Sequence, residues 1–501
     1  MTLRFLKRRP QFVKVGGTAL LAASAGIGTC AGQTSQNATD SPSSGDVKVS
    51  GSLRSRVEVW NWFEGNGNNQ YAFSDSIFRL SFTGVQERYD WKLELAAPIL
   101  LGLPSNSTVP GPQGAMGLGA NYFSANDQNT NAALIFPKQG YVRFKFQNGG
   151  WKQSLQLGRT EFIDGGETAP KNATLATVKR ERVAQRLLAN FGFSDVGRGF
   201  DAVEYTASTS ATNLTLLAAR PTRGVFQVDG WGEVNVNVFY GALTHDTGSN
   251  SSATDWRLFG IGYGDQRDGV AKVDNRPETV RSADHEHINL ATLGGHYLHA
   301  EETNAGTVDV LFWGALQFGS WGTLAQRAGA FAAEAGWQPP VLPRVKPWLR
   351  GGYDYGSGDK NPNDETHGTF FQLLPTPRIY ARFPFFNMMN NRDAFGEFVF
   401  RPAKGMVIRS DIHALSLAKA NDLWYSGGGV YQPWTFGYTG RPSNGHSALG
   451  TLYDISADYT FSPHWSTGLY YGHAAGRALI QSIYPKGDSG DFGFVELNWY
   501  F

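Results

Sequence analysis

The chain has 501 residues, with 44 Lys and Arg against 43 Asp and Glu, which gives a formal net charge of +1 at pH 7. It contains 61 Gly, 67 aromatic residues and one Cys, so it has no intramolecular disulfide framework, and its charge balance gives no sign of a nucleic-acid partner. Mean hydropathy is −0.32. Beyond the N-terminal region, no segment approaches the roughly 18 consecutive apolar residues of a membrane helix.

The N-terminus predicts export. Arg4 and Lys7 to Arg9 form a basic start, residues 15–27 form a short apolar run, and Thr29-Cys30-Ala31 offers a cleavage site. This pattern is typical of a secretory signal peptide over residues 1–31, whose removal leaves a mature chain without cysteine. Arg8-Arg9 matches a twin-arginine signal imperfectly, and Thr29 is a poor residue before a lipoprotein cysteine. Residues 32–46 are predicted to be a polar linker.

Alternation with period 2 then dominates the sequence. Residues 47–59 place Val47, Val49, Leu53, Val57 and Val59 on one face and polar residues on the other. The same pattern recurs at 78–83, 91–95, 141–146 and 234–238. About 18 candidate strands of roughly ten residues can be counted, which is the length that a tilted membrane strand needs.

The connections between these strands alternate between short and long. The short ones lie at 86–88, 148–150, 210–211, 402–403 and 462–463. The long ones lie near 99–137, 159–199, 267–285, 357–390, 418–448 and 476–489. Short periplasmic turns and long extracellular loops are typical of a bacterial outer-membrane barrel, whereas a sandwich or propeller has no reason for this regularity.

The last ten residues, 492–501, repeat the pattern at the C-terminus. Val495, Leu497, Trp499 and Phe501 alternate with polar residues such as Glu496. A closing barrel strand that ends in an interfacial aromatic girdle has this form. We therefore predict an all-β fold, a transmembrane antiparallel up-and-down β-barrel of about 18 strands over residues 47–501.

One loop differs from its neighbours. Residues 174–191 space their apolar side chains as a helix does and carry Lys179, Arg180, Arg182 and Arg186. Because this helix lies within the long loop 159–199, we expect either a plug that folds into the lumen or a small helix that caps the barrel mouth.

Cations are frequent at positions that the alternation directs into the lumen. Guanidinium groups bind carboxylates in a bidentate manner, so a ring of such cations would favour an anionic sugar chain. Arginine ladders that only order a porin wall are the alternative. The candidate lumen residues on the early strands are Lys48, Arg54, Arg56, Arg79, Lys92, Arg143 and Lys145, with Glu58 and Glu94 as acidic exceptions.

Aromatic residues allow two interpretations. We expect seven tryptophans in the interfacial girdles: Trp60, Trp62, Trp151, Trp313, Trp321, Trp465 and Trp499. The loop aromatics either stack on sugar rings at the mouth or, as we favour, pack the loops together. They are Phe370, Phe371, Phe383, Phe385, Phe386, Trp424, Tyr425, Trp434 and Phe436.

Catalytic and metal-binding motifs are weak. The pairs His413/Ser416 and His464/Ser466 lack a nucleophile context. His285-Glu286-His287 is poor as a metal motif, and the Asp- and Asn-rich stretch 354–364 does not have EF-hand spacing. The sequence predicts no enzyme, no cofactor and no metal.

Several segments resemble the bacterial alginate export family. They are Leu155-Gln-Leu-Gly-Arg159, the blocks 352–359 and 367–371, and the stretches 387–390, 421–425 and 433–436. The resemblance extends from about residue 47 to 501 and is strongest after 351. It implies an 18-stranded barrel that passes an anionic polyuronate through an arginine-lined constriction. Arg159, in the matching Leu-Gly-Arg context, is the residue for which it implies a place in that constriction.

The resulting prediction is a channel in the outer membrane of a Gram-negative bacterium. It would pass an anionic polysaccharide or oligosaccharide, such as an alginate-like polyuronate, by passive diffusion. The substrate would bind Arg159 and the early-strand cations named above other than Lys48. Outer-membrane lipid and periplasmic secretion proteins are the expected partners. The alternatives are a general or anion-selective porin, or a structural barrel whose loops bind a partner.

Overall fold

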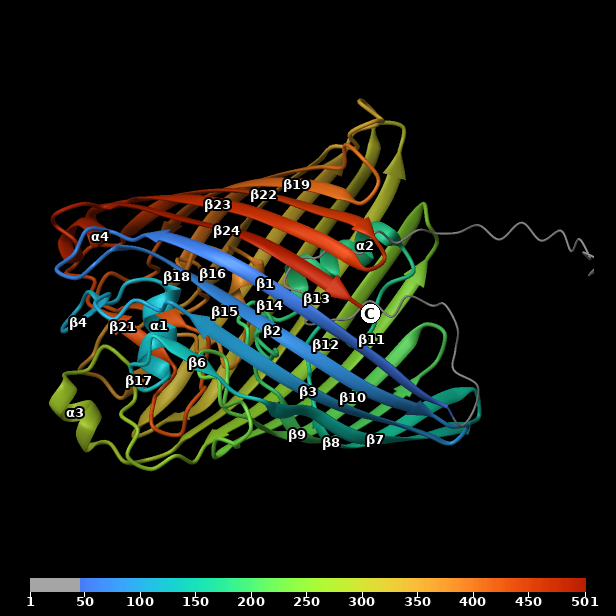
Figure 1. Ribbon diagram of the computed structural model, residues 1–501, viewed down its shortest axis with the longest axis horizontal. Coiled ribbons are helices and arrows are strands. Elements are labelled where there is room, and N and C mark those ends of the chain that lie inside the picture. Colours follow the sequence, from blue (N-terminus) through green and yellow to red (C-terminus); the bar gives the residue numbers. More distant parts are fainter. Residues whose placement is uncertain (1–45) are drawn as a thin grey trace, which may run out of the picture.

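The chain forms a closed antiparallel β-barrel of 18 strands in the computed structural model, which describes residues 46–501. The predicted signal peptide, and the linker up to residue 45, lie outside the described residues. Figure 1 shows the tilted strands, with most of the loops and short helices gathered at one end. The barrel strands are β1 (Val47–Asn61), β2 (Gln70–Val85), β3 (Tyr89–Leu101), β7 (Phe136–Asn148), β8 (Trp151–Thr160), β9 (Phe200–Ser208), β10 (Thr212–Pro221), β11 (Val236–Gly248), β12 (Ser252–Asp265), β13 (Ile288–Thr303), β14 (Gly306–Trp321), β15 (Leu324–Gln338), β16 (Trp348–Gly356), β18 (Asn391–Phe400), β19 (Met406–Ser416), β22 (Ala448–Ser462), β23 (Trp465–Gly476) and β24 (Ser489–Tyr500).

Shorter elements belong to the loops. The helices are α1 (Leu118–Ala125), α2 (Ala173–Val178), the π-helix η1 (Lys179–Val183), α3 (Glu278–Ala283), the 3₁₀ helix η2 (Pro377–Ile379) and α4 (Ala478–Ile483). The short strands are β4 (Thr108–Val109), β5 (Gly114–Ala115), β6 (Asn131–Ala133), β17 (Thr366–His367), β20 (Trp424–Gly427) and β21 (Tyr438–Arg441). None of the helices in residues 46–501 has the length and apolar character needed to cross a membrane.

The last strand closes the barrel on the first. β24 pairs antiparallel with β1 from Ser52 opposite Tyr500 to Asn61 opposite Asp491. The predicted alternation is confirmed on both strands. On β1, Val57 and Val59 are at least half exposed, whereas Arg56 and Glu58 are buried. On β24, Val495 is 56% exposed, whereas Glu496 is buried. The apolar face therefore points outward to lipid, and the polar face points into the lumen.

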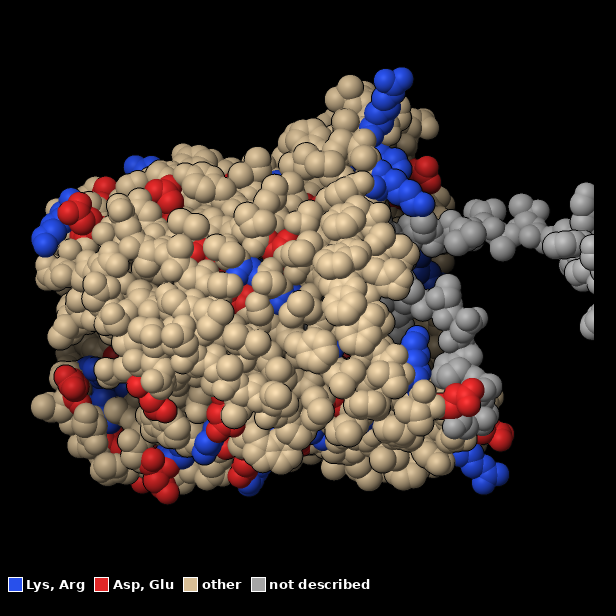
Figure 2. All heavy atoms as spheres, viewed as in Figure 1, with Lys and Arg blue, Asp and Glu red and all other residues tan. Residues whose placement is uncertain are grey.

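The two ends of the barrel differ as predicted. At one end, which we call the turn end, most strands are joined by two to five residues, as at 86–88, 149–150 and 304–305. Gly149 and Gly150 both have positive φ, which a two-residue hairpin turn of the mirror-image type requires. The long connections lie at the other end, the loop end. On the face drawn in Figure 2, the wall between the two ends is mostly uncharged.

The prediction of a tryptophan girdle is wrong for four of the seven residues. Trp60, Trp62, Trp313 and Trp321 are at most 3% exposed, because they face the lumen or the loops rather than lipid. Trp60 Nε1 donates a hydrogen bond to Glu58, and Trp321 Nε1 donates one to Asp274. The other three lie at the turn end and are partly exposed: Trp151, Trp465 and Trp499.

The lipid-facing assignment of β24 can be tested at Val495. We expect Val495→Arg to destabilise the barrel by about 2–4 kcal/mol, because a charge on the lipid face loses its hydration. Urea unfolding in detergent micelles, followed by the gel-mobility difference between folded and unfolded barrel, would measure the loss. Val495→Ile is the matched control, and equal stability of the two variants would contradict the assignment.

Candidate functional site

The lumen contains a long segment of the chain. Residues 161–199, which we call the inner segment, leave β8 and return to β9 at the loop end. The segment nevertheless reaches the turn end, where Asn172 donates a hydrogen bond of 2.9 Å to the carbonyl oxygen of Asn250 between β11 and β12. Figure 1 shows α2 at the same end of the barrel as the C-terminus. The inner segment therefore descends through the lumen and returns.

The helix within this segment is shorter than the sequence predicts. It begins at Ala173, where the Asn172 side chain accepts a hydrogen bond from the Leu175 N–H, and it ends at Val183. Ala184 is extended and Gln185 has a φ of 68°, so the chain leaves the helix there. The predicted continuation to residue 191 is wrong, because residues 187–189 instead exchange backbone hydrogen bonds with Leu374 in the loop 357–390.

Ion pairs join the inner segment to strands on all sides of the wall. Arg186, which is fully buried, lies 2.7 Å from Asp354 on β16 and 3.1 Å from Glu334 on β15. Its guanidinium group also packs between the rings of Tyr380 and Trp313. The other pairs are Glu161–Arg79, Asp164–Arg257, Glu167–Arg257, Lys179–Asp255, Glu181–Arg409, Arg182–Glu334 and Asp195–Arg54.

Three of the predicted site residues help to hold the inner segment against the wall. Arg54 donates to the carbonyl oxygens of Gly192 and Ser194 and pairs with Asp195 at 3.0 Å. Arg56 donates to the carbonyl oxygen of Phe193 and pairs with Glu496 at 2.6 Å. Arg79 lies between Glu94 and Glu161. Their guanidinium groups are thus already held by protein carboxylates.

The other four predicted residues also have carboxylate partners. Lys92 pairs with Glu94 at 2.9 Å. Arg143 pairs with Asp90 at 2.8 Å, and Lys145 approaches the same carboxylate at 3.8 Å. Arg159 makes a bidentate pair with Asp201, both distances being 2.7 Å. Its guanidinium lies 4.4 Å from the centre of the Trp231 ring.

The expected place of Arg159 in a lumen constriction is wrong, because Arg159 and Asp201 stand on the same face of β8 and β9 as Leu157 and Val203, which are 40% and 49% exposed. That face points outward. The other six residues do not converge on one point of the lumen.

Burial changes the ionisation of the inner segment. Burial raises the pKa of Asp164 to about 6, although the Arg257 guanidinium and the N–H groups of Leu187 and Leu188 favour its charged form. Burial also lowers the pKa of Lys179, against the opposing effect of Asp255.

A second feature lies at the loop end. Several loops and the end of β1 enclose a cavity of about 1080 Å³, counting the solvent at its mouth, which we call the loop chamber. Its described lining contains three arginines and no Asp or Glu. The side chains that matter for binding are Arg378, Arg382, Arg441, Trp60, Trp62, Phe191, Phe193, Phe226, Trp424, Tyr431, Phe436 and Tyr438.

Several polar atoms of the chamber lining have no hydrogen-bond partner among the described residues. They are Trp62 Nε1, Trp424 Nε1, the Tyr438 hydroxyl, Arg382 Nη1 and Arg441 Nε. The N–H groups are donors, and the hydroxyl can donate. These atoms are themselves buried, so a ligand would reach them only if the lining side chains shifted. Leaving them unpaired costs free energy, which a ligand that accepts hydrogen bonds would recover.

Sequence reasoning did not select the chamber arginines. It favoured loop packing for nine aromatics, and burial confirms this for all except Trp434, which is 58% exposed. The sequence could have indicated these arginines, because Arg378, Arg382 and Arg441 lie close in sequence to the loop aromatics. Arg441 lies over the Trp424 ring at 4.9 Å.

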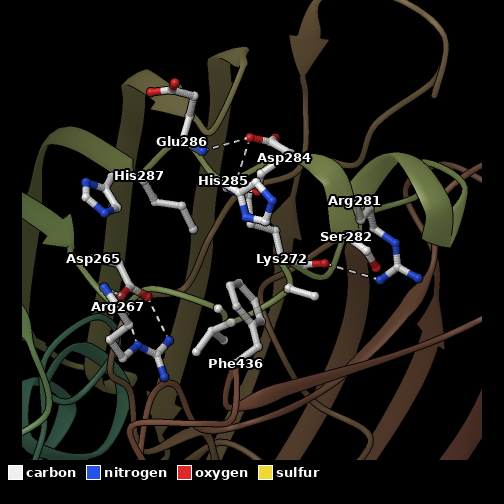
Figure 3. Close-up of a pocket in the computed structure, with 14 residues that line it drawn as sticks. Asp265, Arg267, Lys272, Arg281, Ser282, Asp284, His285, Glu286, His287 and Phe436 are labelled. Carbon is white, nitrogen blue, oxygen red and sulfur yellow. Dashed lines mark hydrogen bonds and ion pairs between the residues drawn. The ribbon is translucent and has the colours of Figure 1, made fainter.

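A further cavity of about 660 Å³, lined mainly by residues 265–288, is more nearly neutral (Figure 3). Its Arg267 pairs with Asp265 at 2.7 Å, and its Lys272 pairs with Asp284 at 3.2 Å. Figure 3 shows the side chains of residues 285–287 pointing apart instead of converging on one point. Among residues 46–501, the carboxylate and imidazole groups that do converge are elsewhere, at Asp411, His413 and Asp454.

Asp164 predicts a pH dependence. Its folded-state pKa of about 6 exceeds the unfolded value of about 3.9, so its protonated form favours the folded state. This contribution is complete below about pH 4 and is lost as pH rises through 6, a fall of about 3 kcal/mol. Asp164→Asn should remove that part of the slope in urea unfolding at pH 4 to 7. Asp268→Asn, at a carboxylate that is 96% exposed, is the control, and parallel pH curves for Asp164→Asn and wild type would contradict the prediction.

The fastening of the inner segment can be tested at Arg186. Arg186→Ala leaves buried carboxylates without a partner and should cost about 3–5 kcal/mol, freeing part of the segment. Limited proteolysis in detergent should then cut within residues 179–199. Arg180→Ala is the matched control, because Arg180 is 44% exposed and pairs with the neighbouring Glu181. Equal protection of both variants would show that the ion pairs do not hold the segment.

Comparisons with known proteins agree with this architecture. Three similar solved structures are OccAB2 of Acinetobacter baumannii, with a TM-score of 0.54, and OccK9 (OpdG) and OpdK with vanillate, both of Pseudomonas aeruginosa, with TM-scores of 0.56 and 0.51. Each is 9% identical to this chain. The matches cover 90–91% of this chain and 98% of the other. At this identity they show the fold alone.

A comparison with curated protein sequences finds no match. The family model for alginate export, however, matches residues 138–482, which is more than half of the chain. Barrel, family and outward apolar face together place the protein in the outer membrane of a Gram-negative bacterium. The chain belongs to the alginate export family.

Proposed function

We propose that this outer-membrane channel passes an anionic saccharide by passive diffusion and that the loop chamber binds the saccharide at the outer end of the path. The observation that carries the proposal is the chamber lining, which has three arginines, no described carboxylate and unpaired donors beside aromatic rings. A uronate unit offers the matching groups, because it has a carboxylate, hydroxyl oxygens and an apolar ring face.

The contacts within the chamber support this chemistry. Arg441 donates to Ser426 Oγ and to backbone carbonyl oxygens, which fixes its guanidinium in the wall. Its Nε remains unpaired, as does Trp424 Nε1 of the ring beneath it. A carboxylate at this point would gain a charge-assisted hydrogen bond, which is stronger than a neutral one. Several such contacts of moderate strength suit transport, since a single strong site would retain the cargo.

The lumen cations are the proposed path below the chamber. Arg143 and Lys145 have side chains that are 43% and 33% exposed and could exchange their protein carboxylate for one of the cargo. Arg54, Arg56, Arg79 and Lys92 are more deeply buried, and the first three also hold the inner segment or the wall around it. The proposed constriction therefore has the inner segment as its principal part. Movement of a long polymer would further require a periplasmic secretion partner at the turn end.

A second candidate function is diffusion of small carboxylates. OpdK, a barrel of similar fold, was crystallised with vanillate, a small aromatic carboxylate. The chamber arginines would also accept such an anion, and the inner segment limits the space in the lumen. A channel for small carboxylates would not prefer a sugar acid to another carboxylate, whereas a saccharide channel would, and this difference separates the two proposals.

Planar-bilayer recording separates them. We expect anion-selective current that trigalacturonate blocks and that neutral maltotriose leaves unchanged. Block by vanillate and trigalacturonate at equal concentration would favour the small-carboxylate channel. A large, weakly selective current that no solute blocks would overturn both and indicate a general porin. Arg143→Ala should weaken both the selectivity and the block, because Arg143 is the most exposed of the predicted arginines that face the lumen.

A matched pair of tyrosine variants tests the chamber itself. Tyr438→Phe removes a hydroxyl that has no described partner, so we expect unchanged or slightly higher stability and about three- to tenfold weaker trigalacturonate block. Tyr425→Phe removes a hydroxyl that donates to Asp422 at 2.8 Å outside the chamber lining. It should cost about 1 kcal/mol of stability and leave the block unchanged. Weaker trigalacturonate block in Tyr425→Phe, with unchanged block in Tyr438→Phe, would contradict saccharide binding in the loop chamber.

A further inference from the structure

A second polar cluster lies on the inward face of the barrel wall, on strands β18, β19 and β22. Asp411 and His413 share one face of β19, and Asp454 stands opposite Asp411 on the neighbouring strand β22. One potential ligand atom from each of the three residues lies within 4.8 Å of the others. The side chains therefore converge from two hydrogen-bonded strands.

In this cluster the strand register places carboxylates opposite one another instead of opposite cations. Glu397 on β18 stands opposite Asp411, which stands opposite Asp454, so three carboxylates form a row across three adjacent strands. Like charges in directly opposite positions destabilise a sheet. Arg409 lies 3.7 Å from Glu397 but also pairs with Glu181 of the inner segment. Arg382 lies 3.8 Å from Asp458, which is four residues beyond Asp454 on the same face of β22. Such a row favours a bound cation.

His413 supplies an independent indication of a ligand. The residue is 1% exposed, and its Nδ1 lies 2.7 Å from Asp393 Oδ2. Its Nε2 is buried and has no hydrogen-bond partner among the described residues, and the same is true of Asp411 Oδ1. A carboxylate behind one ring nitrogen, with the other nitrogen left for an ion, is the usual arrangement of a metal-binding histidine.

The surroundings hold these groups in place. The His413 ring stacks on Phe395, with centroids 5.7 Å apart. Asp454 Oδ1 accepts a hydrogen bond of 2.5 Å from the Tyr470 hydroxyl, which leaves its second oxygen for another partner. A Cβ at Gly472, which stands opposite Asp454, would lie 2.5 Å from Asp454 Oδ1, so this position has room for glycine alone.

We propose that Asp411, His413 and Asp454 bind a divalent transition-metal ion of the Zn²⁺ class, with Asp393 positioning the imidazole. One nitrogen and two carboxylate ligands suit Zn²⁺, Co²⁺ or Ni²⁺, whereas Ca²⁺ and Mg²⁺ prefer all-oxygen sites. The bound ion neutralises the carboxylate row and links β19 to β22. The proposal does not depend on the proposed transport function, because it concerns the wall and not the loop chamber.

Cobalt binding tests the proposal directly. The full chain, refolded in detergent without a histidine tag and treated with EDTA, would be titrated with Co²⁺ while its visible absorption is recorded. We expect one Co²⁺ per chain with the bands of a protein-coordinated ion, displaced by Zn²⁺ and not by Ca²⁺ at the same concentration. Absence of these bands, or displacement by Ca²⁺, would overturn the proposal and leave a shared proton as the counter-charge of the row.

Variants identify the ligands. His413→Gln and Asp411→Asn should each abolish the cobalt bands, and Asp393→Asn should weaken binding about 10- to 100-fold while retaining them. The control is His473→Gln, which removes an imidazole bound to a carboxylate, Asp491, at 2.8 Å on the outward face of the neighbouring strand β23. Unchanged affinity in Asp411→Asn and Asp393→Asn would overturn the assignment even if His413→Gln failed to fold.

Discussion

A strand in lipid must have every backbone N–H and C=O group hydrogen-bonded, because no water is present to replace a missing partner. This chain meets that constraint by pairing β24 with β1, so that the sheet has no free edge. Closure then decides the place of every side chain on the strands, since residues of one parity face lipid and those of the other parity face a common interior. The polar half of each strand is thereby forced into one confined space.

Confinement explains why the interior is a network of ion pairs. Charged groups from opposite walls cannot all be solvated, so they are satisfied by one another or by the inner segment. Arg186 and Arg182 together engage Glu334 and Asp354 from two strands. A buried pair adds little net stability over apolar packing, but a broken one is costly, so such pairs define where the segment lies more than they strengthen the barrel. The segment is therefore held in one position along the length of the lumen.

The alternation of apolar and polar residues along the sequence was sufficient to predict which strand side chains face lipid and which face the lumen. Val57 outside and Arg56 inside follow from alternation alone, and so do the strand count and the two unlike ends. What depends on partners distant in sequence was not predictable. Arg54 finds Asp195 at a separation of 141 residues, and nothing near either residue indicates the other. Trp321 has the composition of a girdle residue, yet its indole bonds to Asp274 from a loop. The helix beyond Val183 was lost because backbone pairing with Leu374 replaced its intrahelical hydrogen bonds.

The same distinction separates the wall from the loop chamber. Most charged groups on the wall have a partner on a neighbouring strand or on the inner segment, although single polar atoms such as Trp313 Nε1 are unpaired there too. At the carboxylate row the register brings acid opposite acid, and the Nε2 atom of His413 has no partner among the described residues. In the chamber, five polar atoms remain unpaired although the surrounding loops are closely packed by aromatic rings. A packed region could have satisfied or replaced these donors by small changes of side chain, as Trp to Phe would do at positions 62 and 424. Retaining donors that cost stability is consistent with their use by a ligand, and three arginines without a described carboxylate among the lining residues favour an anion over a cation.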